Sequence, residues 1–304
     1  IMSSSTGSSS KNGSKSQRTI LVTGGGGLVG HGIQLALESC CPQTSDSWIW
    51  LRSRDGDLRK LDECKALFEK HKPTHVVHLA ARVGGLYGNL KYKVEFFRDN
   101  MAINDNVLFC CKEYKVDKCV SCLSTCIFPD KTSYPINEEM LHNGPPHSSN
   151  EGYAYAKRMI DVLNRCYHSQ YGCNFTSIIP TNIFGPFDNF NIENGHVIPG
   201  LMHKCLLAEK SQQDFVVWGS GKPLRQFIYS VDLGKLIIWV LDNYDALEPI
   251  ILSVPEKDEV SIKQIAQMVA NGMAFSGKLV MDATKADGQF KKTADNTKLM
   301  KLYP

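Results

Sequence analysis

The most constraining feature of the sequence is a run of glycines directly behind a short apolar segment, residues 19–22. The glycines follow the pattern G-x-x-G-x-x-G and open a stretch, 28–38, with the composition of a helix. Glycine allows a tight turn, and the start of the helix offers free backbone N–H groups to a phosphate. The pattern predicts a dinucleotide-binding turn, with a merely flexible glycine turn as the alternative. The residues expected along the dinucleotide are Gly24, Gly27, Leu28, Val29 and Gly30.

Apolar runs alternate with amphipathic stretches through the first two-thirds of the chain. The apolar runs, which we expect to be strands, cover residues 19–22, 48–51, 75–79, 118–123 and 175–179. The expected helices cover residues 28–38, 61–70, 96–114 and 153–171. Strands that are apolar almost throughout belong in a parallel sheet with helices on both faces. The sequence therefore predicts an α/β fold with a doubly wound parallel sheet, whose ligands bind at the carboxyl ends of the strands.

The composition changes after residue 180, where residues 182–199 are rich in Gly, Pro, Asn and Phe and favour a structured loop over a site. A helix is expected over 197–207, two strands joined by a turn over 215–218 and 225–229, and an α/β segment from 251 onward. We expect a dinucleotide-binding domain of residues 18–180 plus 226–250, and a smaller, discontinuous α/β substrate domain of residues 181–225 plus 251–304. The serine-rich residues 1–17 are expected to be a disordered tail or a cloning remnant.

Composition argues against several classes of protein. A net charge of +3 with scattered basic residues argues against a nucleic-acid partner. The longest apolar run, 236–241, is far shorter than the roughly 20 residues that span a bilayer. The eleven cysteines are odd in number and several lie in apolar runs, which predicts reduced thiols in the cytoplasm. Cys119 and Cys122 have the spacing of zinc ligands, but within a strand they point to opposite faces, so we expect no metal site.

Tyr153 and Lys157 lie four residues apart at the start of an expected helix, which places both side chains on one face. A lysine cation stabilises a phenolate and can hold a nicotinamide ribose, so the tyrosine can donate a proton near neutral pH. Ser124 follows the fourth expected strand, where its hydroxyl can hydrogen-bond a reacting carbonyl oxygen. These three residues predict redox chemistry on a carbonyl with a nicotinamide cofactor.

Two further side chains bear on an additional proton transfer. Cys126 lies two residues beyond Ser124, and in an extended segment both point to the same side. Its thiol is either a small buried hydrophobe or, with a cation nearby, a proton acceptor. His196 lies just before an expected helix that begins near a proline, and by itself it carries little weight.

The end of the second expected strand bears on the choice between NAD and NADP. Arg52 and Arg54 stand beside Asp55 there. A guanidinium suits the 2′-phosphate of NADP, whereas a lone acidic residue suits the ribose 2′-hydroxyl of NAD. Arg54 therefore favours NADP, with an exposed loop arginine as the alternative. Further cofactor contacts are expected from Asp57, Leu58, Leu79, Ala80 and Ala81.

Longer blocks of sequence carry a resemblance that covers essentially everything after residue 18. They are Val83-Gly-Gly-Leu86, Ser121-Cys-Leu-Ser-Thr-Cys-Ile-Phe-Pro129, Gly152-Tyr-Ala-Tyr-Ala-Lys157, Pro180-Thr-Asn-Ile-Phe-Gly-Pro186, Gly195-His-Val-Ile-Pro199 and Val217-Trp-Gly-Ser-Gly221. With these blocks the chain resembles the GDP-L-fucose synthases, a family of extended short-chain dehydrogenases/reductases with a Rossmann fold. Generic sugar-nucleotide epimerases share the glycine turn and the Tyr/Lys pair, but not the Ser–Cys and His-Val-Ile-Pro blocks.

The resemblance implies an enzyme that inverts carbons 3 and 5 of GDP-4-keto-6-deoxy-D-mannose and then reduces carbon 4 with NADPH. It implies Cys126 as base and His196 as acid in the inversions. It also implies that Ser124 and Tyr153 bind the C4 oxygen and that Lys157 tunes the tyrosine. Further cofactor contacts fall to Pro180, Asn182 and His196, and GDP-sugar contacts to Val83, Gly84, Asn182, Lys204, Trp218, Arg225 and Lys285. A homodimer is implied, through a four-helix bundle of helices 96–114 and 153–171.

Two other functions stay open on the residues alone. A simple sugar-nucleotide 4-epimerase recycles a bound NAD and needs no Cys/His pair, so net consumption of NADPH distinguishes the two enzymes. A non-catalytic NADP-sensing module could use the same fold. Such a sensor has no need for proton donors such as Ser124 and Tyr153 beside the nicotinamide.

Overall fold

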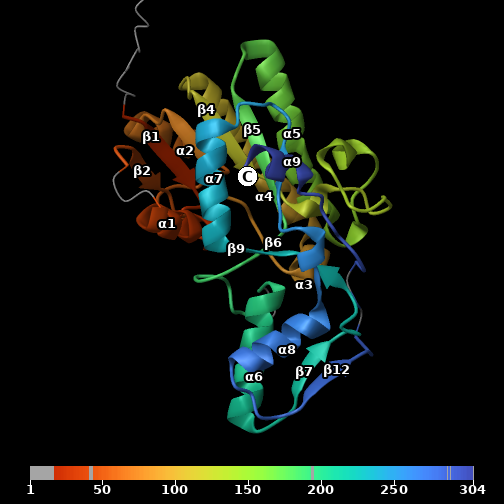
Figure 1. The fold of residues 1–304 in the computed structure, drawn as a ribbon. Helices are drawn as coiled ribbons and strands as arrows, with labels where there is room; N and C mark the ends of the chain where they lie inside the picture. Colours follow the sequence, from red (N-terminus) through yellow and green to blue (C-terminus); the bar gives the residue numbers. More distant parts are fainter. Residues whose placement is uncertain (1–16, 41–43, 193–194, 286, 288, 304) are drawn as a thin grey trace, which may run out of the picture.

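The larger part of the molecule is built on one parallel sheet. The computed structural model describes residues 17–40, 44–192, 195–285, 287 and 289–303, so residues 1–16 of the expected tail lie outside the described residues. Six strands pair in the order β10-β5-β4-β3-β1-β2 (Figure 1). They are β1 (Thr19–Thr23), β2 (Ser47–Trp50), β3 (His75–His78), β4 (Lys118–Cys122), β5 (Phe175–Pro180) and β10 (Ile250–Leu252). All neighbours pair in parallel, which confirms the predicted fold and adds β10 as a sixth strand.

Helices cover both faces of this sheet. α1 (Leu28–Cys40) and α7 (Ser230–Asn243) pack together on one face (Figure 1), and α2 (Leu61–His71), α4 (Lys93–Glu113) and α5 (Glu151–Tyr171) cover the other. Alternation along β1 explains both layers, because Leu21 joins the core under α2, α4 and α5 while Ile20 and Val22 face α1 and α7. A short helix, α3 (Leu86–Lys91), precedes α4. Within the described ranges, no helix is long and apolar enough to cross a membrane.

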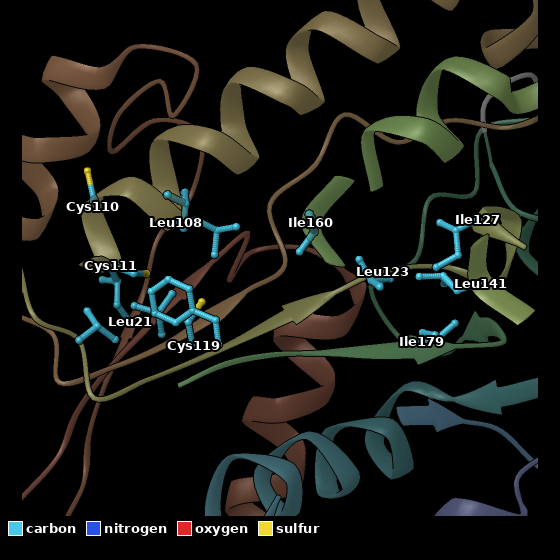
Figure 2. Close-up of a cluster of buried hydrophobic side chains, with 14 of the residues drawn as sticks. Leu21, Leu108, Cys110, Cys111, Cys119, Leu123, Ile127, Leu141, Ile160 and Ile179 are labelled. Carbon is cyan, nitrogen blue, oxygen red and sulfur yellow. The ribbon is translucent and has the colours of Figure 1, made fainter. Parts of the chain in front are cut away.

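The core under α4 and α5 contains cysteines packed among aliphatic side chains (Figure 2). Cys110, Cys111 and Cys119 are fully buried and free, beside Leu21 and Leu108. They act as the small hydrophobes expected from the sequence. The same cluster continues through Leu123 and Ile127, so the segment that carries Ser124 and Cys126 is anchored in the core.

A smaller body lies beside the sheet, at the bottom of Figure 1. It contains α6 (Val197–Ser211), β7 (Phe215–Trp218), α8 (Ile262–Gly272) and β12 (Leu279–Asp282), which share one apolar core. β8 (Leu224–Arg225) pairs antiparallel with β11 (Val260–Ser261), and β6 (Asn182–Phe184) pairs in parallel with β9 (Phe227–Tyr229). The last helix, α9 (Thr297–Leu302), returns to the large sheet beside β10.

The strands expected at 215–218 and 225–229 are present as β7, β8 and β9, and β7 and β9 each pair with a strand from elsewhere in the chain. β7 pairs with β12, and β9 pairs with β6. Phe215 and Val217 of β7 complete the core of the smaller body, whereas Ile228 of β9 belongs to the core of the larger one. The two strands serve different cores, so a short turn between them does not make a hairpin.

α1 and α7 approach each other at two glycines. A Cβ added at Gly32 would lie 2.2 Å from the backbone oxygen of Ser230, and one added at Gly234 would lie 2.5 Å from that of Gly32. Neither obstacle is the flexible end of a side chain, so the helices would have to separate to admit a methyl group. This contact fixes the glycine turn at the start of α1 against the rest of the fold.

We expect Gly32→Ala to lower the free energy of unfolding by about 1–3 kcal/mol, because the new methyl group clashes with backbone. Urea unfolding of both proteins measures the difference. Gly200→Ala in α6 is the matched control, since nothing lies within 4 Å of its added Cβ. Alanine there should stabilise the helix by up to about 1 kcal/mol. Equal unfolding midpoints for Gly32→Ala and the wild type would contradict the packing argument.

Candidate functional site

One cavity of about 1150 Å³ lies at the carboxyl ends of the parallel strands. Its walls come from the segments that follow β1, β3, β4 and β5, as the doubly wound fold predicts. The smaller body closes it with His196, Val197 and Ile198 at the start of α6. Its volume is sufficient for a dinucleotide with a second ligand beside it. In the described segments, no group of three or more His, Cys, Asp or Glu side chains could hold a metal ion.

The glycine turn forms one end of the cavity. Gly24 has φ +70°, and a Cβ there would lie 2.9 Å from the backbone nitrogen of Ala80, so the turn and the end of β3 meet backbone to backbone. Gly27 donates its N–H to the oxygen of Gly24 at 3.0 Å, closing the turn. Gly30 lies behind the cavity wall. The predicted residues that line the cavity here are Gly24, Gly27, Leu28, Val29, Leu79, Ala80 and Ala81.

Ser124, Tyr153 and Lys157 lie together in the cavity wall. Ser124 follows β4 and its Oγ accepts from the N–H of Cys126 at 3.4 Å, capping the turn Thr125–Ile127. Lys157 is 2% exposed and its Nζ donates to the oxygen of Cys122 at 2.8 Å, which ties α5 to the end of β4. Burial raises the pKa of Tyr153 well above its usual range and lowers the pKa of Lys157. The phenol therefore carries its proton at neutral pH and can donate it.

Cys126 lies in the same wall beside a lysine that the sequence analysis missed. The thiol is 8% exposed, and burial raises its pKa. Lys292 opposes this shift most strongly, and the thiolate in turn favours the charged form of Lys292, whose pKa is lowered by burial. Lys292 is placed from far away in the sequence, because Ile136 donates its N–H to the oxygen of Thr293 at 2.8 Å. Lys157 and Ser124 also lower the pKa of the thiol.

His196 enters the cavity from the smaller body. It stands immediately before α6, and its backbone oxygen accepts from the N–H of Gly200 at 3.0 Å. Its Nδ1 lies 3.1 Å from Oδ1 of Asp188. The cavity thus holds a thiol from the larger body and an imidazole from the smaller one.

The arginine region differs from the expectation in detail. Arg52 and Ser53 line the cavity, whereas Arg54 lies on the exposed turn and is not in the wall. The predicted Asp57 and Leu58 do line it, beside Arg59 and Arg82, which the sequence analysis overlooked. The Arg59 guanidinium binds Asp57 at 2.8 Å and holds the pKa of that carboxyl at about 2.

The residues that the resemblance connects with the GDP-sugar fall into two groups. Val83, Gly84 and Asn182 line the cavity, as does Pro180, whereas Lys204, Trp218, Arg225 and Lys285 lie outside its wall in the smaller body. The Lys204 ammonium sits 3.6 Å from the centre of the Trp218 ring. Arg225 donates to the backbone oxygens of Leu224 and Gln289, each at 2.6 Å.

The chain matches the model of the NAD dependent epimerase/dehydratase family over residues 20–254. It is 63% identical over 289 residues to the GDP-L-fucose synthase of Dictyostelium discoideum, covering 95% of this chain and 90% of that protein. It is 54% identical over 294 residues to a probable GDP-L-fucose synthase of Drosophila melanogaster, covering 94% and 91%.

The chain is also similar to solved structures. A GDP-L-fucose synthetase from Naegleria fowleri bound to NADP superposes with a TM-score of 0.90 at 54% identity, over 94% of this chain and 87% of that one. A UDP-glucose 4-epimerase from Thermotoga maritima, at 17% identity and a TM-score of 0.76, shares the fold alone over 93% of this chain and 91% of that one.

We expect Lys292→Met to slow alkylation of Cys126 at neutral pH, because losing the ammonium raises the pKa of the thiol and lowers the thiolate fraction. The rate is followed against pH by mass spectrometry of the Cys126 peptide. Lys291→Met is the matched control, since Lys291 binds Glu256 at 3.1 Å and does not line the cavity. If both variants show the same pH midpoint as the wild type, Lys292 does not act on the thiol.

Proposed function

We propose that this chain makes GDP-L-fucose from GDP-4-keto-6-deoxy-D-mannose. The premise is its family: the chain belongs to the NAD dependent epimerase/dehydratase family and, within it, to the GDP-L-fucose synthases. The reaction inverts carbons 3 and 5 and reduces the C4 ketone. The observation that carries the proposal is the presence of two sets of proton-transfer groups in one cavity. Ser124 and Tyr153 suffice for reduction, whereas Cys126 and His196 are needed only for inversion.

Inversion requires a hydrogen to leave one face of a carbon and a proton to arrive on the other. The hydrogens at C3 and C5 are acidic because both carbons adjoin the C4 ketone. In our proposal the Cys126 thiolate removes each hydrogen, and Lys292 and Lys157 favour that thiolate. His196 then returns a proton from the opposite body. Ser124 and Tyr153 hydrogen-bond the C4 oxygen and stabilise the enolate as charge develops on it.

Reduction uses the same oxygen. Bound NADPH supplies the hydride to C4, while the Tyr153 phenol gives its proton to the C4 oxygen. Lys157 is held rigidly by the Cys122 oxygen, so its charge stays beside the site. The glycine turn fits a dinucleotide, because it lines the cavity directly before α1, where the free N–H groups of the helix start can bind a pyrophosphate. We assign the cofactor to the cavity-lining residues Gly24, Gly27, Leu28, Val29, Asp57, Leu58, Leu79, Ala80, Ala81, Pro180, Asn182 and His196. Gly30 lies behind this wall, and the role of Arg54 in cofactor choice is the subject of a separate prediction.

The GDP-sugar is assigned to the part of the cavity nearest the smaller body. Val83, Gly84 and Asn182 contact the sugar end in this proposal. Lys204, Trp218, Arg225 and Lys285 take the nucleotide, and we add Lys292, because a diphosphate is bound best by cations. The cation stacked on the Trp218 ring must move aside if a base is to occupy that face.

We propose the expected division into two domains, with β10 counted in the dinucleotide-binding domain because it pairs with β5. We also propose a homodimer, in which α4 and α5, side by side in one copy, would meet the same two helices of a second copy in a four-helix bundle. Sedimentation equilibrium tests that dimer. Free thiols buried in the core support a reducing compartment, the cytoplasm.

Absorbance of NADPH after addition of GDP-4-keto-6-deoxy-D-mannose tests the function, with NADH in a parallel cell. Stoichiometric oxidation of NADPH with GDP-L-fucose as product supports it. A product inverted at C4 alone, with no net consumption of NADPH, would instead indicate a 4-epimerase. Binding of NADPH without turnover would indicate a sensing module.

Cys126→Ser and Tyr153→Phe should separate inversion from reduction. We expect Cys126→Ser to abolish solvent-deuterium incorporation at C3 and C5 while NADPH binding persists, because a hydroxyl is a far weaker base than a thiolate. Tyr153→Phe should lose reduction more than deuterium incorporation, since Ser124 still binds the C4 oxygen. Nuclear magnetic resonance of the recovered sugar measures incorporation. Unchanged incorporation in Cys126→Ser would remove that residue from the base role.

Arg52→Ala and Arg54→Ala test which arginine selects NADPH over NADH. The Arg52 side chain lies along the glycine turn, because a Cβ at Gly26 would be 3.1 Å from its Cγ. We expect Arg52→Ala to reduce the NADPH preference in kcat/KM by about tenfold, the value of one charged hydrogen bond. Arg54→Ala should change it little. The reverse order would favour Arg54, the residue chosen from the sequence.

A further inference from the structure

A buried carboxylate lies behind His196, in the loop that joins β6 to α6. Oδ1 of Asp188 is 3.1 Å from Nδ1 of His196. The side chain of Asp188 is 3% exposed, whereas that of His196 is 49% exposed and lines the cavity. The carboxylate therefore holds the inner edge of the ring and leaves the outer edge, with Nε2, for the cavity.

This arrangement bears on which ring nitrogen exchanges its proton. An ionised carboxylate only accepts hydrogen bonds, so Nδ1 must carry a hydrogen whether the ring is neutral or charged. Proton gain and loss then occur at Nε2. Oδ2 of Asp188 is buried and has no hydrogen-bond partner among the described residues, so the ring is the main compensation for the buried charge.

The loop holds both groups in place. The N–H of Asn189 donates to the same oxygen, Oδ1 of Asp188, at 2.7 Å, which helps to fix the carboxylate. Phe187, the preceding residue, stacks on His31 of α1 with ring centres 4.1 Å apart. The loop is thus anchored to the larger body while its last residue starts a helix of the smaller one.

We propose that Asp188 is a positioning residue for His196: it keeps the proton on Nδ1 and directs Nε2 at the substrate carbon to be protonated. The proposal rests on the function above, in which His196 delivers protons at C3 and C5. Asp188 does not line the cavity, so in this proposal it acts only through the imidazole.

The first readout is the protonation state of the ring. Magnetic resonance of protein labelled at its histidine nitrogens gives the tautomer, and His196→Asn identifies the resonances of His196. We expect Nδ1 to carry the proton in the wild type and in Asp188→Asn, whose amide oxygen still accepts. In Asp188→Ala the proton should be shared with Nε2, because the acceptor is gone.

The second readout is inversion in heavy water without NADPH. In Asp188→Ala, as in His196→Asn, Cys126 can still exchange the substrate hydrogen on its own face, but the opposite face is not protonated. We expect deuterium incorporation with retained configuration and a fall of about tenfold or more in inversion, with KM little changed. Asp188→Asn should recover part of the inversion.

Asn189→Ala is the matched control, because it removes a loop hydrogen bond, from Asn191 N–H to Asn189 Oδ1 at 3.0 Å, without touching the ring. It should behave as the wild type. If Asp188→Ala keeps the proton on Nδ1 and inverts at the wild-type rate while His196→Asn does not invert, the role of Asp188 is wrong and the function stands. If His196→Asn inverts normally, the acid role of His196 fails, and the proposal for Asp188 fails with it.

Discussion

The parallel pairing of β1, β3, β4 and β5 is the constraint on which the site depends. In a parallel sheet all carboxyl ends lie at one edge, so chain segments far apart in sequence leave the sheet side by side. This brings the turn at Gly24, the small residues after His78 and the Ser124–Cys126 segment to one place. The strands are held from both faces by separate apolar cores, which gives that edge a fixed geometry. Burial of each aliphatic side chain contributes about 1.5–3 kcal/mol to the stability of the fold.

The second body needs its own attachment, and Gln226 provides much of it. This side chain is 1% exposed. Its amide nitrogen donates to the oxygens of Val254 and Ala294, and its oxygen accepts from the N–H of Ala294 at 2.7 Å. Its own backbone oxygen accepts from Asn182. One buried residue thus ties Asn182 of β6 to the segment that carries Lys292, which helps to bring a lysine from the last part of the chain beside Cys126.

Local patterns predicted most of the fold and only part of the site. Strand and helix positions in the larger body follow from apolar periodicity, and Ser124, Tyr153 and Lys157 follow from their places on those elements. The pairing of β7 with β12 depends on a core formed by distant segments, so local periodicity locates β7 without identifying its partner. The presence of Lys292 in the cavity wall, and of Arg52 there in place of Arg54, depends on where the chain directs each side chain. Such directions are set by contacts like that of Ile136 with Thr293, which leave no mark in local sequence.

A two-body cavity also has a chemical reason. A reductase needs its proton donor and its hydride near one carbonyl, and a single sheet edge can supply both. Inversion of a ring carbon needs one group on each face of the ring, and groups carried by one edge approach from one side. Here Cys126 comes from the sheet edge and His196 from the start of α6, across the cavity. The charged side chains have the same logic: Lys157 and the carboxylate of Asp188 are buried and Lys292 is half-buried, at a cost in stability. In our proposal Lys157 and Lys292 favour the Cys126 thiolate and Asp188 keeps a proton on His196, so the cost is confined to the site where the chemistry requires it.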